Sequence, residues 1–266
     1  MKFRRKLRML LAVDAGNTEL KAGLFQGEEL LGVCRLAADP ALPGEELAAR
    51  LYGLFDFKGL RVREAEGSVF STVVPALRAP IGEALRLLCG GKPLAVGPGV
   101  RTGLNLRVEN PLSMGADFVC CAVGALARFQ PPLAVFDLGT ATAVTVLDRA
   151  GVFAGRAILC GVQLGMTALS EHTAALPAAE LRAPGGLLGR NTADALASGA
   201  VYGAAAMVDG LLERFGEEYG PGLTGVLTGG HCGLVAPYCK QAVQVDPFLA
   251  LHGLRQIFLK NRRPLQ

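Results

Sequence analysis

"LAVDAGNTELKAGLF" at residues 11–25 and "LAVFDLGTATAVTVL" at residues 133–147 follow one pattern. In each stretch an apolar run ends at an acid, a turn with glycine and threonine follows, and a second run of β-forming residues begins. Both stretches continue through a short turn into a third such run, "LLGVCRL" in the first and "VFAGRAIL" in the second. The sequence therefore predicts one β-meander that occurs twice, about half a chain apart.

Helical patterns follow each copy of the meander. They lie at residues 44–57, 78–89 and 114–129 after the first copy, and at residues 162–173, 191–218 and 247–260 after the second. Meanders followed by helices, twice over, predict two α/β lobes with mixed sheets flanked by helices. A cleft between such lobes, with one acid and one glycine-bearing turn from each, would suit a nucleotide and its metal.

Composition and charge limit the class of protein. The chain of 266 residues is 51% hydrophobic and 19% charged, so it can bury a substantial core. Its formal net charge of +4 comes largely from the two ends, and we interpret the basic segment at residues 1–8 as a tip before the first strand. No basic stripe with interleaved aromatic residues occurs, which argues against nucleic-acid binding. No run of about 18 apolar residues occurs either, which argues against a membrane span.

The cysteines and histidines do not form a recognisable metal or disulfide pattern. The seven cysteines are odd in number, include no C-x-x-C pair and lie within apolar segments. This pattern indicates free thiols in a reducing compartment, and we expect the cytoplasm. The three histidines, at 172, 231 and 252, lack the spacing of zinc ligands.

The first turn, "DAGNTELK", has residues that suit an anion. Gly16 lets backbone N–H groups approach a phosphate, Asn17 and Thr18 can donate hydrogen bonds, and Lys21 supplies a positive charge. Asp14 cannot favour a phosphate directly, so it implies a cation or a water molecule between them. An ordinary hairpin turn explains the same residues equally well.

The second turn, "DLGTAT", favours the functional interpretation because it repeats the first. Asp137, Gly139, Thr140 and Thr142 reproduce the arrangement, and two acids at matched positions could share one Mg²⁺–nucleotide complex. In a third element, "VLTGGHCG" at residues 226–233, Gly229 and Gly230 could let a nucleotide base lie against the backbone. A plain strand-to-helix turn explains that element at least as well.

Taken together, these motifs resemble those of the type III pantothenate kinases, a branch of the acetate and sugar kinase/Hsp70/actin superfamily. The similarity extends in order through "STVVPAL" at 71–77, "VGPGVRTGLNLRVENP" at 96–111, "GAD" at 115–117, "GRAILCG" at 155–161, "GRNTADALASGAVYG" at 189–203 and "LTGG" at 227–230. The fold that this resemblance implies is a pair of duplicated actin-like (ribonuclease H-like) lobes with a nucleotide cleft between them. We expect the lobes at residues 1–130 and 131–266.

The resemblance also implies an activity. It implies ATP-dependent phosphorylation of pantothenate to 4'-phosphopantothenate, the first step of coenzyme A biosynthesis, by a homodimer that uses Mg²⁺ and a monovalent cation, K⁺ or NH₄⁺.

Site residues follow from the same resemblance. The turn from Asp14 to Lys21 would bind ATP phosphates together with Thr140, and Asp137 would bind the monovalent cation. Asp117 would be the general base that accepts the substrate's hydroxyl proton. Pantothenate would be contacted at two places. Gly115, Ala116, Asp117 and position 118 form the first, and Thr192 forms the second. Without the resemblance, the better explanation of Asp117 is an acid at a helix N-terminus, where the helix dipole favours it.

The chain departs from the family pattern at several positions. Phe118 occupies the place of an arginine after Gly-Ala-Asp, Ala143 replaces a hydroxyl residue, Cys160 replaces a proline, and Asn191 stands where an aspartate often occurs. Phe118 is either a core residue on an apolar helical stripe or a lost charge near the substrate. Two alternatives therefore stay open: a degenerate member with weak or no kinase activity that binds nucleotide or regulates, and a kinase for another small hydroxylated acid.

Overall fold

The computed structural model describes residues 9–110 and 114–262, which form two compact units. The first unit contains residues 9–103, 114–127 and 250–262, and the second contains residues 104–110 and 128–249. The predicted basic tip at residues 1–8 falls outside the described residues.

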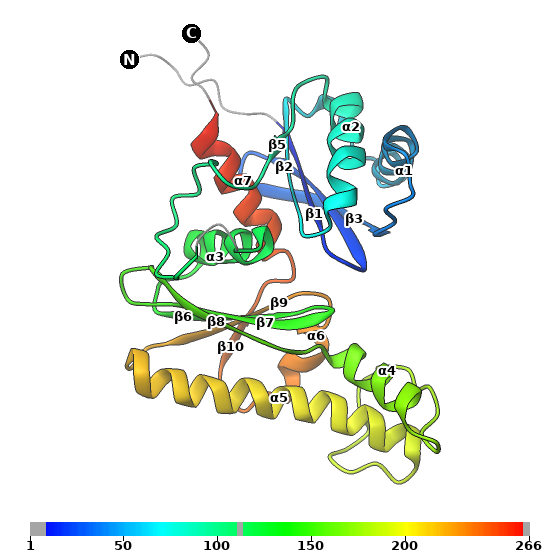
Figure 1. The fold of residues 1–266 in the computed structure, drawn as a ribbon, viewed down its shortest axis with the longest axis vertical. Helices are drawn as coiled ribbons and strands as arrows, with labels where there is room; N and C mark the ends of the chain where they lie inside the picture. The colour runs from blue at the N-terminus through cyan, green and yellow to red at the C-terminus, as the bar shows by residue number, and fades with distance from the viewer. Residues whose placement is uncertain (1–8, 111–113, 263–266) are drawn as a thin grey trace. The chain divides into compact units, whose positions relative to one another are not determined.

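The first unit is built on a five-stranded sheet with strand order β3-β2-β1-β4-β5 (Figure 1). Its strands are β1 (Met9–Ala15), β2 (Glu19–Gln26), β3 (Glu29–Ala37), β4 (Gly67–Thr72) and β5 (Leu94–Ala95). Its helices are α1 (Gly44–Phe57), α2 (Arg78–Cys89), α3 (Ala116–Arg128) and α7 (Leu249–Asn261), with short 3-10 turns at Val62–Glu64 and Pro75–Leu77.

The second unit is built on a five-stranded sheet with strand order β10-β9-β6-β7-β8. Its strands are β6 (Leu133–Leu138), β7 (Ala141–Leu147), β8 (Phe153–Cys160), β9 (Thr224–Thr228) and β10 (Val243–Val245). Its helices are α4 (Val162–His172), α5 (Thr192–Tyr219) and α6 (Cys232–Val235), with a 3-10 turn at Ala236–Tyr238.

The two sheets share one topology. In each, the three strands of the meander pair antiparallel, and the first of them also pairs parallel with a later strand, β4 or β9. Both meanders have a register shift at the same place, between Leu24 and Phe25 in one and between Val146 and Leu147 in the other. The predicted duplication with mixed sheets is therefore confirmed, down to an irregularity in the pairing.

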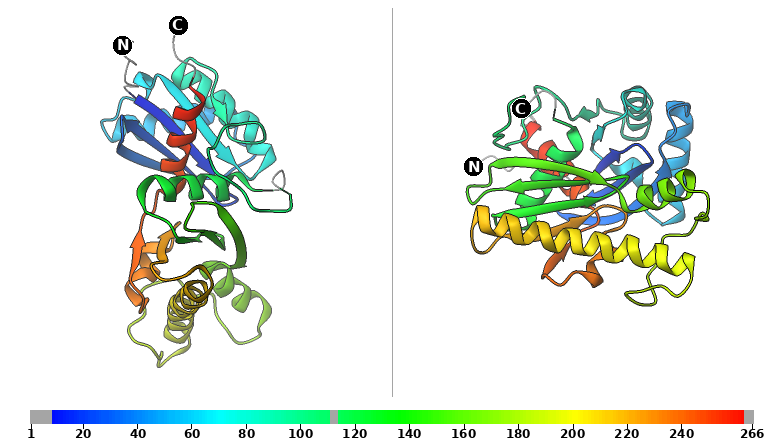
Figure 2. Two further views of the ribbon diagram at one scale, coloured as in Figure 1. Left: turned by 90° about the vertical axis from the view of Figure 1, so that its left-hand side faces the viewer. Right: turned by 60° about the horizontal axis from the view of Figure 1, so that its bottom comes forward.

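Helices cover both faces of the first sheet (Figures 1 and 2). On one face, α1 and α2 contribute Phe55 and Leu85 to a core that includes Leu11 and Leu24 of the sheet. On the other face lies α7, which approaches closely because strand glycines leave room. A Cβ atom at position 23 would collide with Leu251, and a Cβ atom at position 67 would collide with Phe258.

The long helix α5 covers one face of the second sheet (Figure 2). Val208 and Leu212 of α5 pack with Phe136, Leu138 and Val144 in the core of this unit. By length and composition α5 could span a membrane, and 33% of its most apolar window is buried. A single such helix is a weak indicator, because core helices of globular proteins meet the same criterion.

The six predicted helices all occur, with ends that differ from the prediction by at most a few residues. The short helix α6 and the short strands β5 and β10 were not predicted, because each is too short to show a periodic pattern. By its contacts α7 groups with the first unit, although it follows the second unit in the chain. The division at residues 130 and 131 stays a prediction.

Candidate functional site

The first turn connects β1 to β2. Asp14 is the second-last residue of β1 and pairs with Lys21 of β2. Within the turn, the Gly16 N–H donates a hydrogen bond to the Glu19 carbonyl at 3.0 Å. Asn17 and Thr18 are exposed. Gly16 has no positive φ, and a Cβ there would meet only ordinary contacts within the turn. Without a side chain, Gly16 lets a ligand such as a phosphate approach its backbone closely.

Asp14 sits among groups of both charges. The Ser71 hydroxyl of β4 donates to Oδ1 of Asp14 at 2.7 Å. Burial raises the pKa of Asp14 above its usual value, while the Ser71 hydrogen bond and the Lys21 charge act to lower it. The negative charges of Asp117 and Glu19 raise the pKa of Asp14 further. The carboxylate form of Asp14 would thus be favoured by a cation.

Asp117 lies in the first turn of α3, where the helix dipole favours a negative charge. Its Oδ1 atom is buried and lies against Gly115, where a Cβ would collide with it. Close to this helix, Gly253 of α7 leaves room for the Cys120 carbonyl of α3, which a Cβ at Gly253 would displace. Because the charge of Asp117 raises the pKa of Asp14, the structure brings these two acids near each other within one unit.

Phe118 points into the protein. Its side chain is 9% exposed, and Ala122 and Ala125 on the same stripe of α3 are fully buried. The interpretation of Phe118 as a core residue is therefore confirmed. Ala116, which precedes the Asp117–Phe118 pair, is the first residue of α3.

The second turn connects β6 to β7 and is one residue shorter than the first. The Gly139 N–H donates to the Ala141 carbonyl at 3.1 Å, and Thr140 at the tip is exposed. Gly229, with φ of +89°, lies directly against the Asp137 carboxylate, where any Cβ would collide. The third glycine element thus joins the second turn within the same unit, while Gly230 has open space around its Cα.

Thr142 does not join the turn, contrary to the arrangement expected from "DLGTAT". Its side chain is fully buried, and it lines a cavity beneath α4 and α5. Thr142 belongs to β7, where it pairs in the sheet with Leu138, and its side chain lies on the face of the sheet that α4 and α5 cover.

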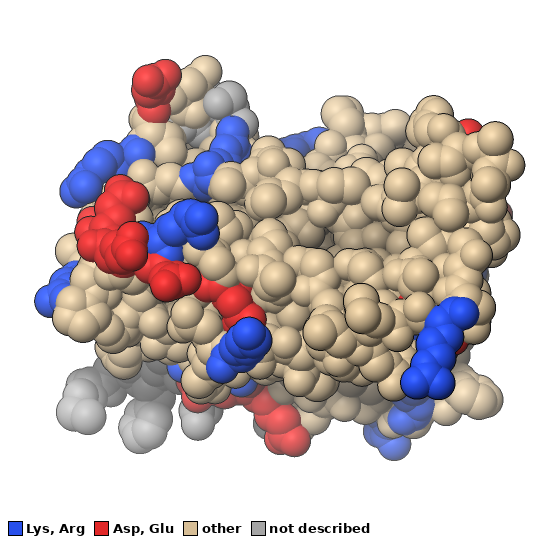
Figure 3. All heavy atoms as spheres, turned by 90° about the horizontal axis from the view of Figure 1, so that it is seen from below, with Lys and Arg blue, Asp and Glu red and all other residues tan. Residues whose placement is uncertain are grey.

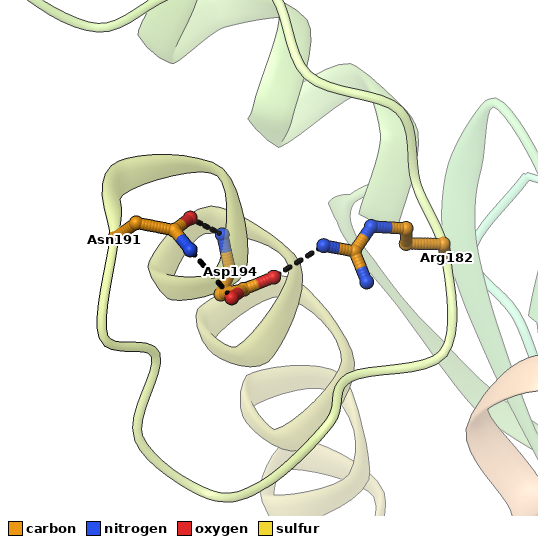
Figure 4. Close-up of polar contacts among 3 residues, drawn as sticks. All are labelled: Arg182, Asn191 and Asp194. Carbon is orange, nitrogen blue, oxygen red and sulfur yellow. Dashed lines mark hydrogen bonds and ion pairs between the residues drawn. The ribbon is translucent and has the colours of Figure 1, made fainter.

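Thr192 is the first residue of α5 and is exposed. A compact polar network holds this helix end (Figure 4). Asn191 caps the helix by accepting from the Asp194 N–H at 2.9 Å, and its amide donates to Asp194 Oδ2 at 2.7 Å. Arg182 from the preceding loop forms an ion pair with the same Asp194 carboxylate. Asn191 therefore serves here as a helix cap.

The acids of the first unit suit a magnesium ion bound together with phosphates. Among the described residues, no group of three or more His, Cys, Asp or Glu side chains could hold a metal alone. Mg²⁺ is usually held by one or two carboxylates plus substrate phosphates and water. Asp14 and Asp117, whose negative charges disfavour each other, fit that requirement.

Two side chains near these acids were not assigned by sequence reasoning. Ser71 occurs in "STVVPAL", and Cys120 follows Asp117 by one helical turn. Ser71 is 1% exposed and Cys120 is fully buried. The signal that could have found Ser71 is a polar residue inside an apolar strand, "SVFS", next to a strand that carries an acid.

Comparison with known proteins gives consistent matches. The family model for type III pantothenate kinase matches residues 10–214. A type III pantothenate kinase of Moorella thermoacetica is 37% identical over 253 residues, which cover 95% of this chain and 100% of the relative. One from Exiguobacterium sp. (strain ATCC BAA-1283 / AT1b) is 35% identical over 255 residues, with 96% and 100% coverage.

A solved structure resembles the fold at low sequence identity. The activator of the 2-hydroxyisocaproyl-CoA dehydratase from Clostridium difficile, with bound ADPNP, superimposes with a TM-score of 0.56. It is 12% identical, and the match covers 97% of this chain and 99% of that one. This likeness concerns the fold alone, and it agrees with the duplicated actin-like fold expected from the sequence.

Proposed function

The chain belongs to the type III pantothenate kinase family, and we propose that Asp117 is the general base of its reaction. The chain is thus a kinase that uses ATP to phosphorylate pantothenate, the first step of coenzyme A biosynthesis. The observation that carries the assignment of Asp117 is its place beside Asp14, in the first turn of a helix that close packing holds against α7. No observation favours the two alternatives, a degenerate binding protein and a kinase for another acid.

In this mechanism Asp117 orients the substrate hydroxyl and accepts its proton. The hydroxyl oxygen forms a bond to the γ-phosphorus of ATP while the bond from that phosphorus to the ADP oxygen breaks. Phosphoryl transfer needs mainly positioning and charge stabilisation, so one oriented acid is the usual remaining requirement. Gly115 supports this role, because its missing Cβ lets the Asp117 carboxylate fold back over the helix start. Gly115 and Ala116, with Thr192, are proposed to contact pantothenate.

The two acid turns are proposed to bind the nucleotide. In the first, Gly16, Asn17, Thr18 and Lys21 would contact phosphate oxygens; in the second, Thr140 would do so. The exposed residues at the tips of both turns support these assignments, and Gly16 presents a backbone without a side chain. The nucleotide base would lie near Gly229 and Gly230.

Two cations are proposed, one for each acid turn. Asp14, with Asp117 nearby, would hold Mg²⁺, which when bound neutralises negative charge on the phosphates. Lys21, opposite Asp14 in the β1–β2 pair, would add its own positive charge to the phosphates on that side. Asp137 would hold a monovalent cation, K⁺ or NH₄⁺, with its carboxylate oriented by the backbone at Gly229.

A homodimer is proposed through the surface of α4, α5 and β8, which we call the α4–α5 face. A cavity of about 570 Å³ opens on it, lined by Thr142, Cys160 and Met166 and by small residues of α5. Ile158, Leu164 and Leu169 are exposed around it, and the view from this side shows charged side chains mainly toward the edges of an uncharged, hollowed area (Figure 3). Apolar surface of this extent is typical of an interface between proteins.

The homodimer has its own test. Gly199 of α5 and Gly53 of α1 are both exposed helical glycines with open space around them. Gly199→Arg should convert the dimer to a monomer in light scattering after gel filtration, while Gly53→Arg should leave it dimeric. A wild-type monomer, or a Gly199→Arg dimer of unchanged affinity, would contradict this face as the interface.

The cytoplasm is proposed as the location. All seven cysteines lie within the described residues and are reduced thiols, which suits a reducing compartment. Burial raises the pKa of Cys89 to about 11 and that of Cys239 to about 11, so both thiols would be largely protonated and inert at neutral pH.

The experiment that tests the function is turnover by the purified chain. Pantothenate, ATP, Mg²⁺ and potassium should yield phosphorylated pantothenate and ADP in equal amounts, with no product when Mg²⁺ is chelated. A panel of other small hydroxylated acids should be used far more slowly. A folded protein that binds ATP but leaves pantothenate unchanged would contradict the proposal.

A further inference from the structure

We infer that Ser71 is a positioning residue for the kinase reaction, because its hydroxyl fixes the direction in which the Asp14 carboxylate faces. The inference rests on the proposed function, in which Asp14 holds the magnesium ion with the nucleotide. Ser71 itself would touch neither substrate nor metal. It would act through Asp14.

The strand register places the two side chains beside each other. β1 and β4 pair parallel, with Asp14 as the partner of Ser71. Ser71 is 1% exposed, and its Oγ atom lies 2.7 Å from Oδ1 of Asp14. This is the ordinary length for a hydroxyl donor to a carboxylate, and the donor hydroxyl is buried.

Because Ser71 holds Oδ1 of Asp14, the direction of Oδ2 is fixed as well. The carboxylate torsion of aspartate has a broad energy minimum, so a free Asp14 would sample many directions for its oxygens. With Oδ1 held by Ser71, the planar carboxylate presents Oδ2 in one direction. A magnesium ion demands near-ideal ligand geometry, so the orientation of a single carboxylate affects its affinity directly.

Ser71 also contacts the helix that carries the proposed base. Burial raises the pKa of Cys120 well above its usual value, the charges of Asp14 and Asp117 raise it further, and a side-chain hydrogen bond with Ser71 acts to lower it. Cys120 thus stays a neutral thiol, and it lies three residues after Asp117, on the same side of α3. Ser71 therefore connects the acid of β1 to the acid-bearing helix α3 within one unit.

The second sheet provides an internal parallel. At the corresponding register, Thr228 of β9 pairs with Asp137 of β6, and Thr228 is 2% exposed. A buried hydroxyl residue thus stands beside the acid in both copies of the repeat. The parallel also indicates that threonine fits this position of the topology, which makes Ser71→Thr a suitable conservative variant.

The test compares ADP binding with and without Mg²⁺ by calorimetry. In Ser71→Ala, affinity for ADP with Mg²⁺ should fall about tenfold, in line with loss of a hydrogen bond to a charged group. Affinity for ADP without Mg²⁺ should stay within about twofold, and Ser71→Thr should restore most of the loss. A matched control is Ser68→Ala, because Ser68 is a buried serine of the same strand that hydrogen-bonds Cys89 instead of Asp14. It should leave both affinities unchanged.

Three results would overturn the inference. They are a Ser71→Ala protein with wild-type Mg²⁺ dependence, equal losses with and without Mg²⁺, and an equal loss in Ser68→Ala. If Ser71→Ala does not fold, Ser71→Cys fills the same space with a weak donor and must show the same selective loss. A wild-type protein that binds ADP with Mg²⁺ yet does not phosphorylate pantothenate would contradict the proposed function alone, since the binding comparison does not depend on turnover.

Discussion

Asp14 and Asp137 occupy matching places in two sheets of one topology, yet their neighbours differ. Opposite Asp14 in the antiparallel pair stands Lys21, whereas opposite Asp137 stands Ala143. The parallel neighbours are both hydroxyl residues, Ser71 and Thr228. Both copies of the repeat therefore have the acid and a neighbouring hydroxyl residue, but only the first has a positive charge opposite the acid in the hairpin.

The surroundings of the two acids explain why they would take different cations. Beside Asp14 the structure places a second acid, Asp117, on α3, and the two negative charges favour a divalent ion. Beside Asp137 it places the backbone of Gly229. Under the proposed function, one duplicated turn would serve two electrostatic tasks, because the rest of each unit places different groups beside it.

Loss of the base in the first unit should give the largest effect. Asp117→Asn should lower kcat by about 10² to 10⁴, the usual contribution of general acid–base catalysis. Its affinity for ADP should change by no more than a few-fold, because the base contacts the acceptor and not the nucleotide. Steady-state turnover and calorimetry check the two parts. A variant that keeps most of its kcat would remove Asp117 from the mechanism.

The packing that holds α3 should be the next most sensitive feature. Phe118→Arg places a charge on a buried stripe and should destabilise the protein by about 3 kcal/mol or more. Phe118→Leu, which stays apolar, should cost less, about 1 kcal/mol. Thermal denaturation compares them. If Phe118→Arg melts like the wild type and turns over pantothenate faster, Phe118 is a functional deficit and not a core residue.

The glycines of the second unit give a matched pair. Gly229→Ala should destabilise by about 1–3 kcal/mol, because alanine is strained at positive φ and its Cβ meets the Asp137 carboxylate. Gly230→Ala, with open space, should be close to neutral. Equal melting temperatures for the two variants would show that the turn at Asp137 adapts, and that the carboxylate is not held by this contact.

The smallest effect concerns the charge of Asp14 in the nucleotide-free protein. Its pKa is raised above the ordinary value of 3.8, so the folded state keeps the proton to higher pH than the unfolded chain does. Stability from this group is therefore present at low pH and lost as pH rises through the folded pKa. Asp14→Asn should melt slightly above the wild type at pH 7.5, and the difference should shrink as the pH falls through the folded pKa of Asp14.

A surface control isolates this effect from a simple loss of charge. Asp56→Asn removes an exposed carboxylate of α1. It should show no such pH-dependent difference from the wild type. If Asp14→Asn melts below the wild type at pH 7.5, the Ser71 and Lys21 contacts outweigh the burial of Asp14.

Much of this fold could be predicted from the sequence because the repeat is local. Strand alternation, glycine turns and helical periodicity all act over short stretches, so both meanders and six helices were predicted close to their observed bounds. The return of α7 to the first unit could not be predicted in this way. It depends on close approach at Gly23, Gly67 and Gly253, whose partners are distant in sequence.

The candidate site, too, could be predicted from the sequence only in part. The acids Asp14, Asp117 and Asp137 follow from motifs, and the burial of Phe118 follows from its helical stripe. The pairing of Ser71 with Asp14 does not, because it depends on which strand lies parallel to β1. Local patterns indicate the reactive groups, while strand order decides what orients them.

The proposal that Asp14 binds Mg²⁺ and Asp137 binds a monovalent cation is tested most directly by measuring ADP binding. The measurement compares Asp14→Asn and Asp137→Asn, with and without Mg²⁺ and in sodium or potassium buffers. Asp14→Asn should lose the gain in affinity that Mg²⁺ gives and keep its response to potassium. Asp137→Asn should keep the Mg²⁺ gain and bind ADP equally in the two buffers. The reverse pattern, or the same loss in both variants, would contradict the account.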